Sequence, residues 1–316
     1  MALRVGTRKS ALALTQTTTV ADRLAHITGD LTEIVMIESE GDRMTGSLAT
    51  IGGTGVFASA LRDGLIENRC DLVVHSQKDL PVAAVEGLAI GATPERSDPR
   101  DALCATNGLT IDELPIGGLV GTGSPRRAAA LLAVRPDLII VDIRGNVDTR
   151  LARVGNDLDA VVLAAAGLSR LGRLDAISQI FPFEIVPHAP GQGALAVEVR
   201  VADLDEGSSL AAALGKIGDV PTWLSVAAER EVLAYLEAGC LAPIGAHAQM
   251  SDNGLTLAAT VLRPDGTDSL TRSASVSVPP NDLDSLTVLA RGLGRTVARD
   301  LFDAGAQDLA PLGASQ

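Results

Sequence analysis

The sequence predicts an α/β protein with two lobes around a cleft and a small C-terminal α+β domain. Three observations carry this prediction. Short apolar runs alternate with helical patterns up to about residue 200, polar breaks stand at 94–101 and 187–194, and the pattern changes after about residue 214. Such alternation is typical of largely parallel sheets covered by helices. The length of 316 residues suits two or three domains at roughly 100–200 residues each.

The strands of the two lobes are predicted from short apolar runs that turn residues bound on either side. They are expected at 3–7, 32–38, 70–76, 88–94, 102–106, 119–123, 137–143, 160–166 and 194–200, and helical patterns at 10–27 and 124–136 fill gaps between them. Ligands of such sheets bind at the loops beyond the carboxyl ends of the strands. The loops after these strands are therefore where a site is expected.

The two polar breaks, "PERSDPRD" and "PHAPGQGA", are interpreted as crossings between the lobes. Residues 1–94 with a return segment 194–213 are expected to form lobe 1, and residues 95–193 lobe 2. Residues 214–316 are expected to form the third domain. Its predicted order is a helix at 220–238, strands at 245–251, 255–266 and 273–279, and a helix at 283–305.

Composition excludes several classes of protein. The net charge of −13 argues against a general nucleic-acid binder. No apolar run reaches the roughly 18 residues of a membrane span, and the N-terminus lacks the pattern of a secretory signal. A cytoplasmic protein is therefore expected. Three cysteines and four histidines are dispersed in the sequence, which predicts reduced thiols and no metal site.

The loop "GTGSPRR", 121–127, is a candidate anion site. Ser124 suits an N-cap, and Pro125 suits the first helical position. Free N–H groups at that helix end attract an anion, and the tandem arginines Arg126 and Arg127 add donors. The alternative is an ordinary capped helix with two exposed arginines.

Further arginines follow other predicted strands. Arg144 and Arg150 lie in "DIRGNVDTRL", Arg8 and Ser10 in "GTRKSALAL", and Arg170 in "AAAGLSRLG". Each alone is readily explained as a surface arginine. Together they predict a cleft that binds several carboxylates, because arginine holds a carboxylate with two parallel hydrogen bonds.

The stretch "HSQKDLP", 75–81, places Ser76, Lys78 and Asp79 directly after a buried strand. An ionised Asp79 in a positive cleft would stabilise a cationic intermediate and move a proton. A Lys–Asp surface pair is the alternative. His75 is expected to be a structural residue at the strand end. The glycine-rich loop 51–57 lacks the lysine of nucleotide-binding loops, and Phe57 is expected to pack on a flat ligand.

Cys240 in "LEAGCLAPIG" is a lone thiol beside a glycine. A covalent anchor needs only accessibility, whereas a thiol hydrolase would need a base that the neighbouring sequence does not offer. An incidental loop cysteine is the third possibility.

Seven motifs, in this order and spacing, resemble those of the hydroxymethylbilane synthase, or porphobilinogen deaminase, family across essentially the whole chain. They are "RVGTRKSALAL", "HSQKDLP", "GTGSPRR", "DIRGNVDTRL", "LAAAGLSRLG", "APGQGALAVE" and "EAGCLAPIGAHA". The resemblance implies two lobes of the type 2 periplasmic-binding-protein kind. It also implies that lobe 1 is catalytic, that lobe 2 binds carboxylates, and that the C-terminal domain anchors a cofactor.

The resemblance further implies a transferase of tetrapyrrole (haem) biosynthesis that works as a cytoplasmic monomer. A dipyrromethane cofactor would be attached to Cys240 through a thioether. Four porphobilinogen molecules would then be condensed onto it with loss of ammonia, and water would release linear hydroxymethylbilane. A non-catalytic solute-binding or effector-sensing module of the same fold is the alternative. No nucleic acid, membrane or metal is implied.

Residue roles follow from the resemblance. The catalytic residues would be Asp79, Lys78 and Arg8. Cofactor-binding residues would be Cys240, Ser10, Ser76, Lys78, Asp79, Thr122, Ser124, Arg126, Arg127, Arg144 and Gly145. Substrate-binding residues would be Arg8, Phe57, Arg144, Arg150, Arg170 and Gln192. The sequence departs from the family pattern at Thr50 and Thr54, where lysines are usual, and at Gln77 and Gly123.

Overall fold

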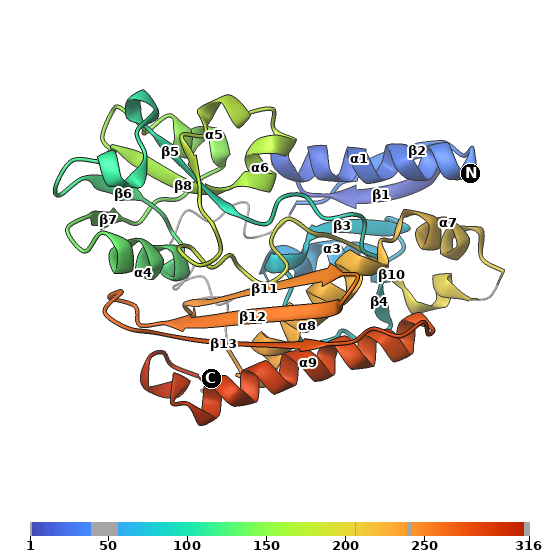
Figure 1. The fold of residues 1–316 in the computed structure, drawn as a ribbon. Coiled ribbons are helices and arrows are strands. Elements are labelled where there is room, and N and C mark those ends of the chain that lie inside the picture. Colours follow the sequence, from blue (N-terminus) through green and yellow to red (C-terminus); the bar gives the residue numbers. More distant parts are fainter. Residues whose placement is uncertain (1, 39–55, 206, 239–241, 313–316) are drawn as a thin grey trace. The chain divides into compact units, whose positions relative to one another are not determined.

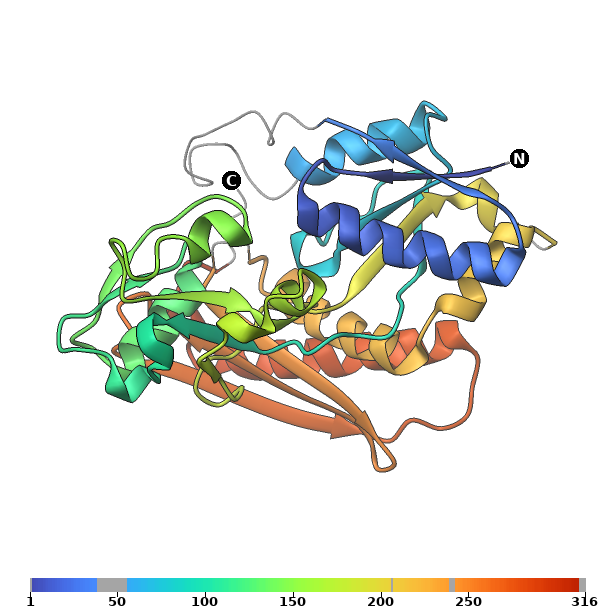
Figure 2. The ribbon, with the colours of Figure 1, turned by 90° about the horizontal axis from the view of Figure 1, so that it is seen from above.

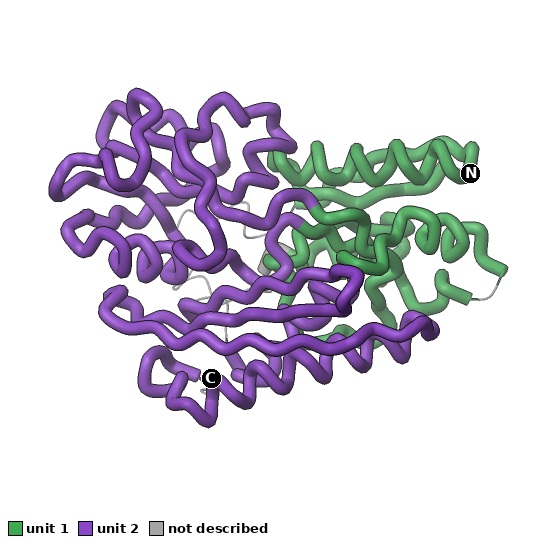
Figure 3. The backbone as a smooth tube through the Cα atoms, in the orientation of Figure 1, with its two compact units in different colours: residues 1–96, 194–223 green, residues 97–193, 224–316 purple. Residues whose placement is uncertain are grey.

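The computed structural model describes residues 2–38, 56–205, 207–238 and 242–312, of which 56 and 57 are described for the backbone alone. The chain divides into two compact units, residues 1–96 with 194–223 and residues 97–193 with 224–316 (Figure 3). The chain passes between the units three times, and the first two passages, at 96/97 and 193/194, fall inside the polar breaks that the sequence singles out.

Unit 1 is built on a five-stranded sheet in the order β2-β1-β3-β10-β4 (Figure 1). Its strands are β1 (Leu3–Thr7), β2 (Thr32–Met36), β3 (Leu72–Ser76), β4 (Leu88–Ala92) and β10 (Leu195–Arg200). The first strand is parallel to β2 and β3, whereas β10 is antiparallel to both of its neighbours.

Helices cover both faces of this sheet, because successive residues of a buried strand point to opposite sides. Leu72 packs into a core with α1 (Ala11–Thr28) and α7 (Ser209–Ile217), and its neighbour Val73 packs into a core with α3 (Val56–Ile66). Figure 2 shows α1 and α3 on opposite sides of the strands. The predicted boundary at residue 214 lies within α7, since Leu214 belongs to the core of unit 1.

Unit 2 contains a second five-stranded sheet in the order β7-β6-β8-β5-β9. Its strands are β5 (Asp101–Ala105), β6 (Leu119–Gly121), β7 (Ile139–Val141), β8 (Ala160–Ala164) and β9 (Gln179–Ile180). The helices α4 (Pro125–Val134), α5 (Val147–Leu151) and α6 (Ala165–Arg170) follow β6, β7 and β8.

The two sheets share one topology. In unit 1, β1 lies between β2 and β3 and is parallel to both, and in unit 2 β6 lies in the same way between β7 and β8. The strand that follows a crossing, β10 or β5, is antiparallel to its neighbours and lies between β3 and β4 or between β8 and β9. This arrangement confirms the predicted α/β class and the two lobes with two crossings.

The rest of unit 2 is an antiparallel three-stranded sheet with two helices. The elements are α8 (Val220–Tyr235), β11 (Ile244–Ser251), β12 (Gly254–Leu262), β13 (Ser269–Val276) and α9 (Leu283–Asp303). Leu262 of β12 shares a core with α4, and Gly266 lies so close to α4 that a Cβ would be 2.8 Å from the Ala129 carbonyl oxygen. The sheet therefore packs onto the second lobe.

Short 3₁₀ helices occur at Gln77–Asp79, Thr106–Gly108, Ile111–Glu113, Leu174–Ala176, Val201–Leu204 and Ala306–Asp308. Within the described residues, every helix is too short or too polar to span a lipid bilayer.

The two crossing segments lie side by side at Ser97 and Gly193. The Ser97 N–H donates to the Gly193 carbonyl at 3.3 Å. Gly193 has φ of +87°, and a Cβ there would be 2.4 Å from the Ser97 carbonyl oxygen. Only glycine fits such a close approach with a left-handed backbone.

Candidate functional site

In unit 1, two of the predicted loops lie at one edge of the sheet. The parallel strands β1 and β3 are neighbours, with Gly6 opposite Val73, so their carboxyl ends meet at the same edge. Arg8 and Ser10 follow β1, and the 3₁₀ helix η1 (Gln77–Asp79) follows β3 directly. The chain segments that carry Arg8, Ser76, Lys78 and Asp79 are therefore brought together.

Local hydrogen bonds explain how this edge is held. The Ser10 hydroxyl caps α1 by accepting from the Ala13 N–H at 3.3 Å. The Thr17 hydroxyl of α1 donates to Thr7 Oγ1 at 2.8 Å and ties the helix to the end of β1. Lys78 is half-buried and Asp79 is exposed. The carboxylate of Asp79 is thus open to a ligand at a place where the backbone is fixed.

His75 has the structural role that the sequence predicts. Its Nε2 lies 3.1 Å from Glu198 Oε2, and Arg62 binds the same buried carboxylate through Nε and Nη2. Burial by itself would raise the pKa of Glu198, but His75 and Arg62 outweigh it and hold that pKa below its usual range. The three side chains link α3, β3 and β10 beneath the loop that carries Asp79.

In unit 2, three parallel strands end at one edge. β6 lies between β7 and β8, and the loops after them carry the arginines that the sequence singles out. These residues are Thr122, Ser124, Arg126 and Arg127 after β6, Arg144, Gly145 and Arg150 after β7, and Arg170 after β8. The loops after β6 and β7 touch, since a Cβ on Gly123 would be 2.7 Å from the Ile143 carbonyl oxygen and 3.7 Å from Arg144 Cζ.

Positive charge accumulates at this edge. The pKa of Arg150 is lowered by burial and, next, by the positive charges of Arg127 and Arg144. Arg150 Nε donates to the Gly145 carbonyl at 2.8 Å, and Arg144 Nε is buried without a hydrogen-bond partner among the described residues. Arg144 Nε is therefore an unused donor within this cluster of Arg127, Arg144 and Arg150, although Arg144 Nη2 lies 3.7 Å from Asp142 Oδ2.

Arg170 is a further cation at the same edge. Its Nη2 donates to the Gly193 carbonyl at 2.6 Å and to Ser97 Oγ at 3.3 Å, both of them neutral acceptors. Burial lowers the pKa of Arg170 to about 10, so that its guanidinium is still charged at neutral pH. Across the described residues, neither Arg150 nor Arg170 forms an ion pair with an acid.

The tandem arginines at the start of α4 are buried, whereas the alternative interpretation of this loop was a capped helix with two exposed arginines. Arg126 and Arg127 are only 4% and 6% exposed, and both bind Asp101, which is fully buried. Arg126 Nη1 lies 2.8 Å from Oδ2, whereas Arg127 Nη2 lies 2.7 Å from Oδ1. Burial alone would raise the pKa of Asp101, but the two guanidinium charges outweigh it and lower that pKa strongly.

The sequence interpretation missed Asp101, because it lies in the polar break at 94–101. Its one signal is its position immediately before an apolar strand. Gln192 also belongs to this network, donating to Asp101 Oδ1 at 2.8 Å and to the Pro99 carbonyl at 2.7 Å. Thr122 and Ser124 shape the adjacent turn, where the Ser124 N–H donates to Thr122 Oγ1 at 3.2 Å.

Several predicted residues lie outside what the structure describes. Cys240 falls in 239–241, and Thr50 and Thr54 fall in 39–55. Phe57 is the second residue of α3, and its side chain is not among those described.

The expectation that the dispersed histidines form no cluster is wrong. His188, Glu229 and His247 place one ligand atom each within 4.8 Å of one another. Sequence distance hid this group, since the two histidines are 59 residues apart.

The structure is that of an α/β protein with an arginine-rich strand edge in unit 2 and, separately, an exposed carboxylate at a strand edge of unit 1. Comparison with known proteins agrees. Residues 3–206 match the family model described as "Porphobilinogen deaminase, dipyromethane cofactor binding domain", and residues 223–303 match its C-terminal domain. The chain belongs to the porphobilinogen deaminase family, whose members are transferases that use porphobilinogen.

Curated relatives support the assignment over nearly the whole chain. Porphobilinogen deaminase of Leifsonia xyli is 55% identical over 98% of this chain and 95% of its own. The enzymes of Cutibacterium acnes and Thermobifida fusca are 51% and 47% identical, covering 99% and 97% of this chain and 98% and 95% of theirs.

Solved structures that the chain partly resembles include a nutrient-binding protein from Burkholderia cenocepacia bound to methionine, with a TM-score of 0.42 and 13% identity. The methionine-binding protein MetQ has a TM-score of 0.44 and 10% identity. They cover 68% of this chain and 90% and 89% of their own.

Proposed function

We propose that this chain is a hydroxymethylbilane synthase that joins porphobilinogen units on a dipyrromethane held by Cys240. The observation that carries the proposal is the arginine cluster at the edge of unit 2. Porphobilinogen has an acetate and a propionate, so a growing oligomer gains two negative charges per unit. Guanidinium groups that repel one another, as Arg150 is repelled by Arg127 and Arg144, are stabilised when carboxylates enter.

The residues of unit 2 fit a polycarboxylate group. Arg144 offers a buried, unsatisfied Nε, and Arg150 and Arg170 have neutral acceptors as their described partners. Charge-assisted hydrogen bonds contribute roughly 1.5–3 kcal/mol each. We assign Arg144, Arg150 and Arg170 to carboxylates directly. Arg127 contributes its charge while it is held by Asp101.

Thr122, Ser124, Arg126, Gly145 and Gln192 are assigned to the same region. Arg126 and Gln192 would support this region without contacting the ligand, because both bind the buried Asp101. A bound dipyrromethane would supply the pyrrole carbon to which the first substrate is joined. Cys240 is the proposed attachment point, as the sole cysteine in the family motif "EAGCLAPIG".

The residues of unit 1 are assigned to the chemistry of the substrate. The bond between the aminomethyl carbon and nitrogen breaks, ammonia leaves, and a cation conjugated with the pyrrole ring remains. The carboxylate of Asp79 stabilises this cation and accepts a ring proton after the new carbon–carbon bond has formed. The substrate's carboxylates are positioned near the Asp79 carboxylate by four neighbouring residues, Lys78, Arg8, Ser10 and Ser76.

We also propose that the protein works as a monomer in the cytoplasm. Cys70 and Cys104 are buried free thiols, which suits a reducing compartment. Light scattering on the purified protein tests the oligomeric state.

Intact-protein mass spectrometry tests the role of Cys240. The untagged wild type is expected to exceed its sequence mass by two linked pyrroles, and Cys240→Ser to match its sequence mass and turn over no porphobilinogen. Cys104→Ala is the control, since that thiol is buried in a strand of unit 2, and it should retain the added mass. Added mass on Cys240→Ser would remove Cys240 from the proposal.

Asp79→Asn tests the proposed carboxylate. It keeps the size of the side chain and is expected to load the added mass while losing at least roughly 100-fold in turnover. Asp30→Asn, another exposed carboxylate of unit 1, is the control and should keep full turnover. Equal rates for the two variants would contradict the role of Asp79.

A further inference from the structure

We propose that His188, Glu229 and His247 bind one zinc ion within unit 2. The three residues are not among those assigned to catalysis or carboxylate binding, and the proposal does not depend on that assignment. The three residues come from the crossing segment before β10, from α8 and from β11. Their ligand atoms lie within 4.8 Å of one another, and two imidazoles with one carboxylate are a common zinc ligand set.

The imidazole of His188 is already oriented as a ligand. Its Nδ1 lies 3.1 Å from the Ala189 carbonyl oxygen, which can only accept a hydrogen bond. The proton therefore belongs on Nδ1, and Nε2 presents a lone pair. Carbonyl groups behind ligating histidines fix the tautomer in this way in known metal sites.

Glu229 is held just as firmly. It is fully buried, and each carboxylate oxygen accepts one backbone N–H, from Gly191 at 2.7 Å and from Ala248 at 2.8 Å. These two hydrogen bonds fix the orientation of the carboxylate. A buried carboxylate beside two imidazoles also supplies the negative charge that a divalent cation requires.

The two histidines face each other across the place where the ion would lie. His188 Nε2 and His247 Nδ1 are 2.9 Å apart, so one proton lies between two nitrogens. Zinc–nitrogen bonds of about 2.0–2.1 Å in a tetrahedral site hold two nitrogens roughly 3.3 Å apart. The two nitrogens therefore need to separate by only a few tenths of an ångström for an ion to replace the shared proton, and the ligand atom of Glu229 lies within 4.8 Å of both.

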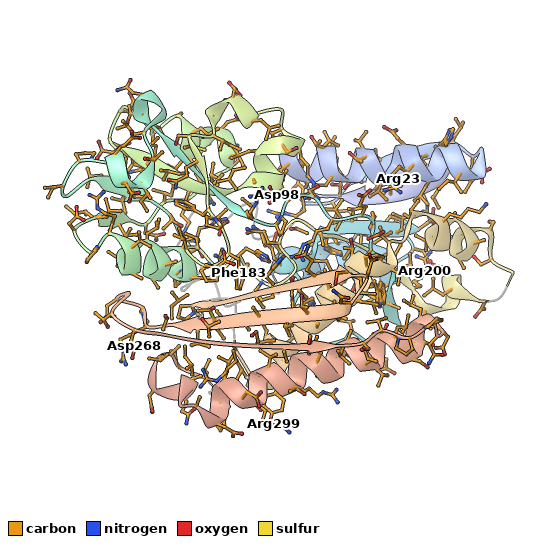
Figure 4. All side chains as sticks on the ribbon, in the orientation of Figure 1. Arg23, Asp98, Phe183, Arg200, Asp268 and Arg299 are labelled. Carbon is orange, nitrogen blue, oxygen red and sulfur yellow. The ribbon has the colours of Figure 1, made fainter. Side chains whose placement is uncertain are left out.

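Phe183 lines one side of the group. Its ring centroid is 5.5 Å from each imidazole, and the two imidazoles are nearly perpendicular at 82° (Figure 4 labels Phe183). Nitrogen ligands favour zinc and its transition-metal neighbours over magnesium or calcium.

A zinc ion here would join the two elements that flank Cys240 in sequence. Glu229 lies on α8, which ends at Tyr235, and His247 lies on β11, which begins at Ile244. The ion would thereby fix both ends of the segment that carries the cysteine. The competing explanation is a hydrogen-bonded His–His–Glu cluster that takes no metal.

Cobalt titration of the untagged full-length protein, first stripped of metal by chelator dialysis, distinguishes the two. We expect one Co²⁺ per chain with the intense visible bands of a four-coordinate site and displacement by Zn²⁺. A near-ultraviolet sulfur-to-cobalt band would show that cysteine binds the metal and would overturn the proposal. No saturable binding at equimolar metal would establish the metal-free cluster and overturn it as well.

The variants His188→Gln and His247→Gln preserve hydrogen-bonding capacity and should each weaken Co²⁺ binding by roughly 100-fold or more. His26→Gln, which replaces an exposed histidine of unit 1, is the matched control and should bind as the wild type does. Proton NMR of the wild-type cobalt form gives a readout that needs no variant to fold. Two exchangeable, hyperfine-shifted imidazole N–H signals support the site, and none would refute it.

Discussion

The buried carboxylate of Asp101 makes the sharpest prediction about stability. Asp101→Asn removes one negative charge and leaves the side chain almost the same size. Two buried guanidinium groups, those of Arg126 and Arg127, then face a neutral amide. An amide NH₂ group also cannot accept hydrogen bonds, so at least one of the present donors loses its acceptor.

The structure sets the expected magnitude. Asp101 accepts four side-chain hydrogen bonds, from Arg126 Nη1, from Arg127 Nε and Nη2, and from Gln192 Nε2. Hydrogen bonds to charged groups are not additive at a shared acceptor, and relaxation admits water after the substitution. Removing one partner of a buried ion pair costs about 3–5 kcal/mol, which is the loss in unfolding free energy that we expect.

Urea unfolding followed by far-ultraviolet circular dichroism measures this loss. Asp98→Asn is the matched control, because Asp98 also pairs with an arginine, Arg100, at 2.7 Å but on the surface (Figure 4 labels Asp98). Its side chain is 33% exposed and that of Arg100 is 48% exposed. Surface pairs of this kind contribute at most about 1 kcal/mol.

The pH dependence gives a second, independent readout. Folding lowers the pKa of Asp101, so the stability from its charge is complete above the unfolded pKa of about 3.9 and disappears as the pH falls toward the folded value. The wild type should therefore lose more stability below pH 4 than Asp101→Asn does. A loss under about 1 kcal/mol in Asp101→Asn, or equal acid sensitivity of both proteins, would refute the reasoning.

Three further predictions address the crossing, the arginine cluster and the thiols. Gly193→Ala should destabilise more than Gly207→Ala in urea unfolding, because both have positive φ but only the first would place a Cβ within 2.4 Å of a carbonyl oxygen. Arg150→Gln should raise KM for porphobilinogen by roughly 10-fold, whereas Arg153→Gln, which removes a surface ion pair, should leave it unchanged. Burial raises the pKa of Cys70 to about 11, so iodoacetamide at pH 8 should alkylate it only after unfolding, and rapid native labelling seen by mass spectrometry would contradict this.

Hydrophobic periodicity predicted the strands of this fold except β9 (Gln179–Ile180), and it predicted α1, α4, α8 and α9 among the helices. The strand expected at 160–166 is β8 (Ala160–Ala164), and the helix expected at 283–305 is α9 (Leu283–Asp303). Both follow from local rules, since a strand buried on both faces is a continuous apolar run and an amphipathic helix repeats every 3.6 residues. The two lobes followed because polar segments interrupt that pattern at the crossings.

The domain boundary near residue 214 was harder to predict, because packing between distant segments decides where it lies. The sequence places a domain boundary at residue 214, yet Leu214 and Ile217 complete a core with α1. An apolar helical turn shows that a face is buried but not which neighbour buries it. The boundary of a domain is therefore a property of packing that a local pattern does not contain.

The partners of buried charges could not be predicted either. Asp101 stands in a run of charged and turn-forming residues, where an exposed side chain is the natural interpretation. Arg126 and Arg127, which bind it, are 25 and 26 residues further along the chain. His188 and His247 show the same limit, because antiparallel and crossing segments bring together residues that no spacing rule connects.

These partners divide the arginines of unit 2 into two groups with different tasks. Arg126 and Arg127 share the single carboxylate of Asp101, which makes it possible to bury them at the start of α4 and leaves one net positive charge. Arg150 and Arg170 have neutral acceptors in the described structure and keep their charge for a ligand. We therefore propose that Asp101 is a positioning residue for the site, since without it Arg127 would not remain buried beside Arg150 and the positive potential of the cluster would fall.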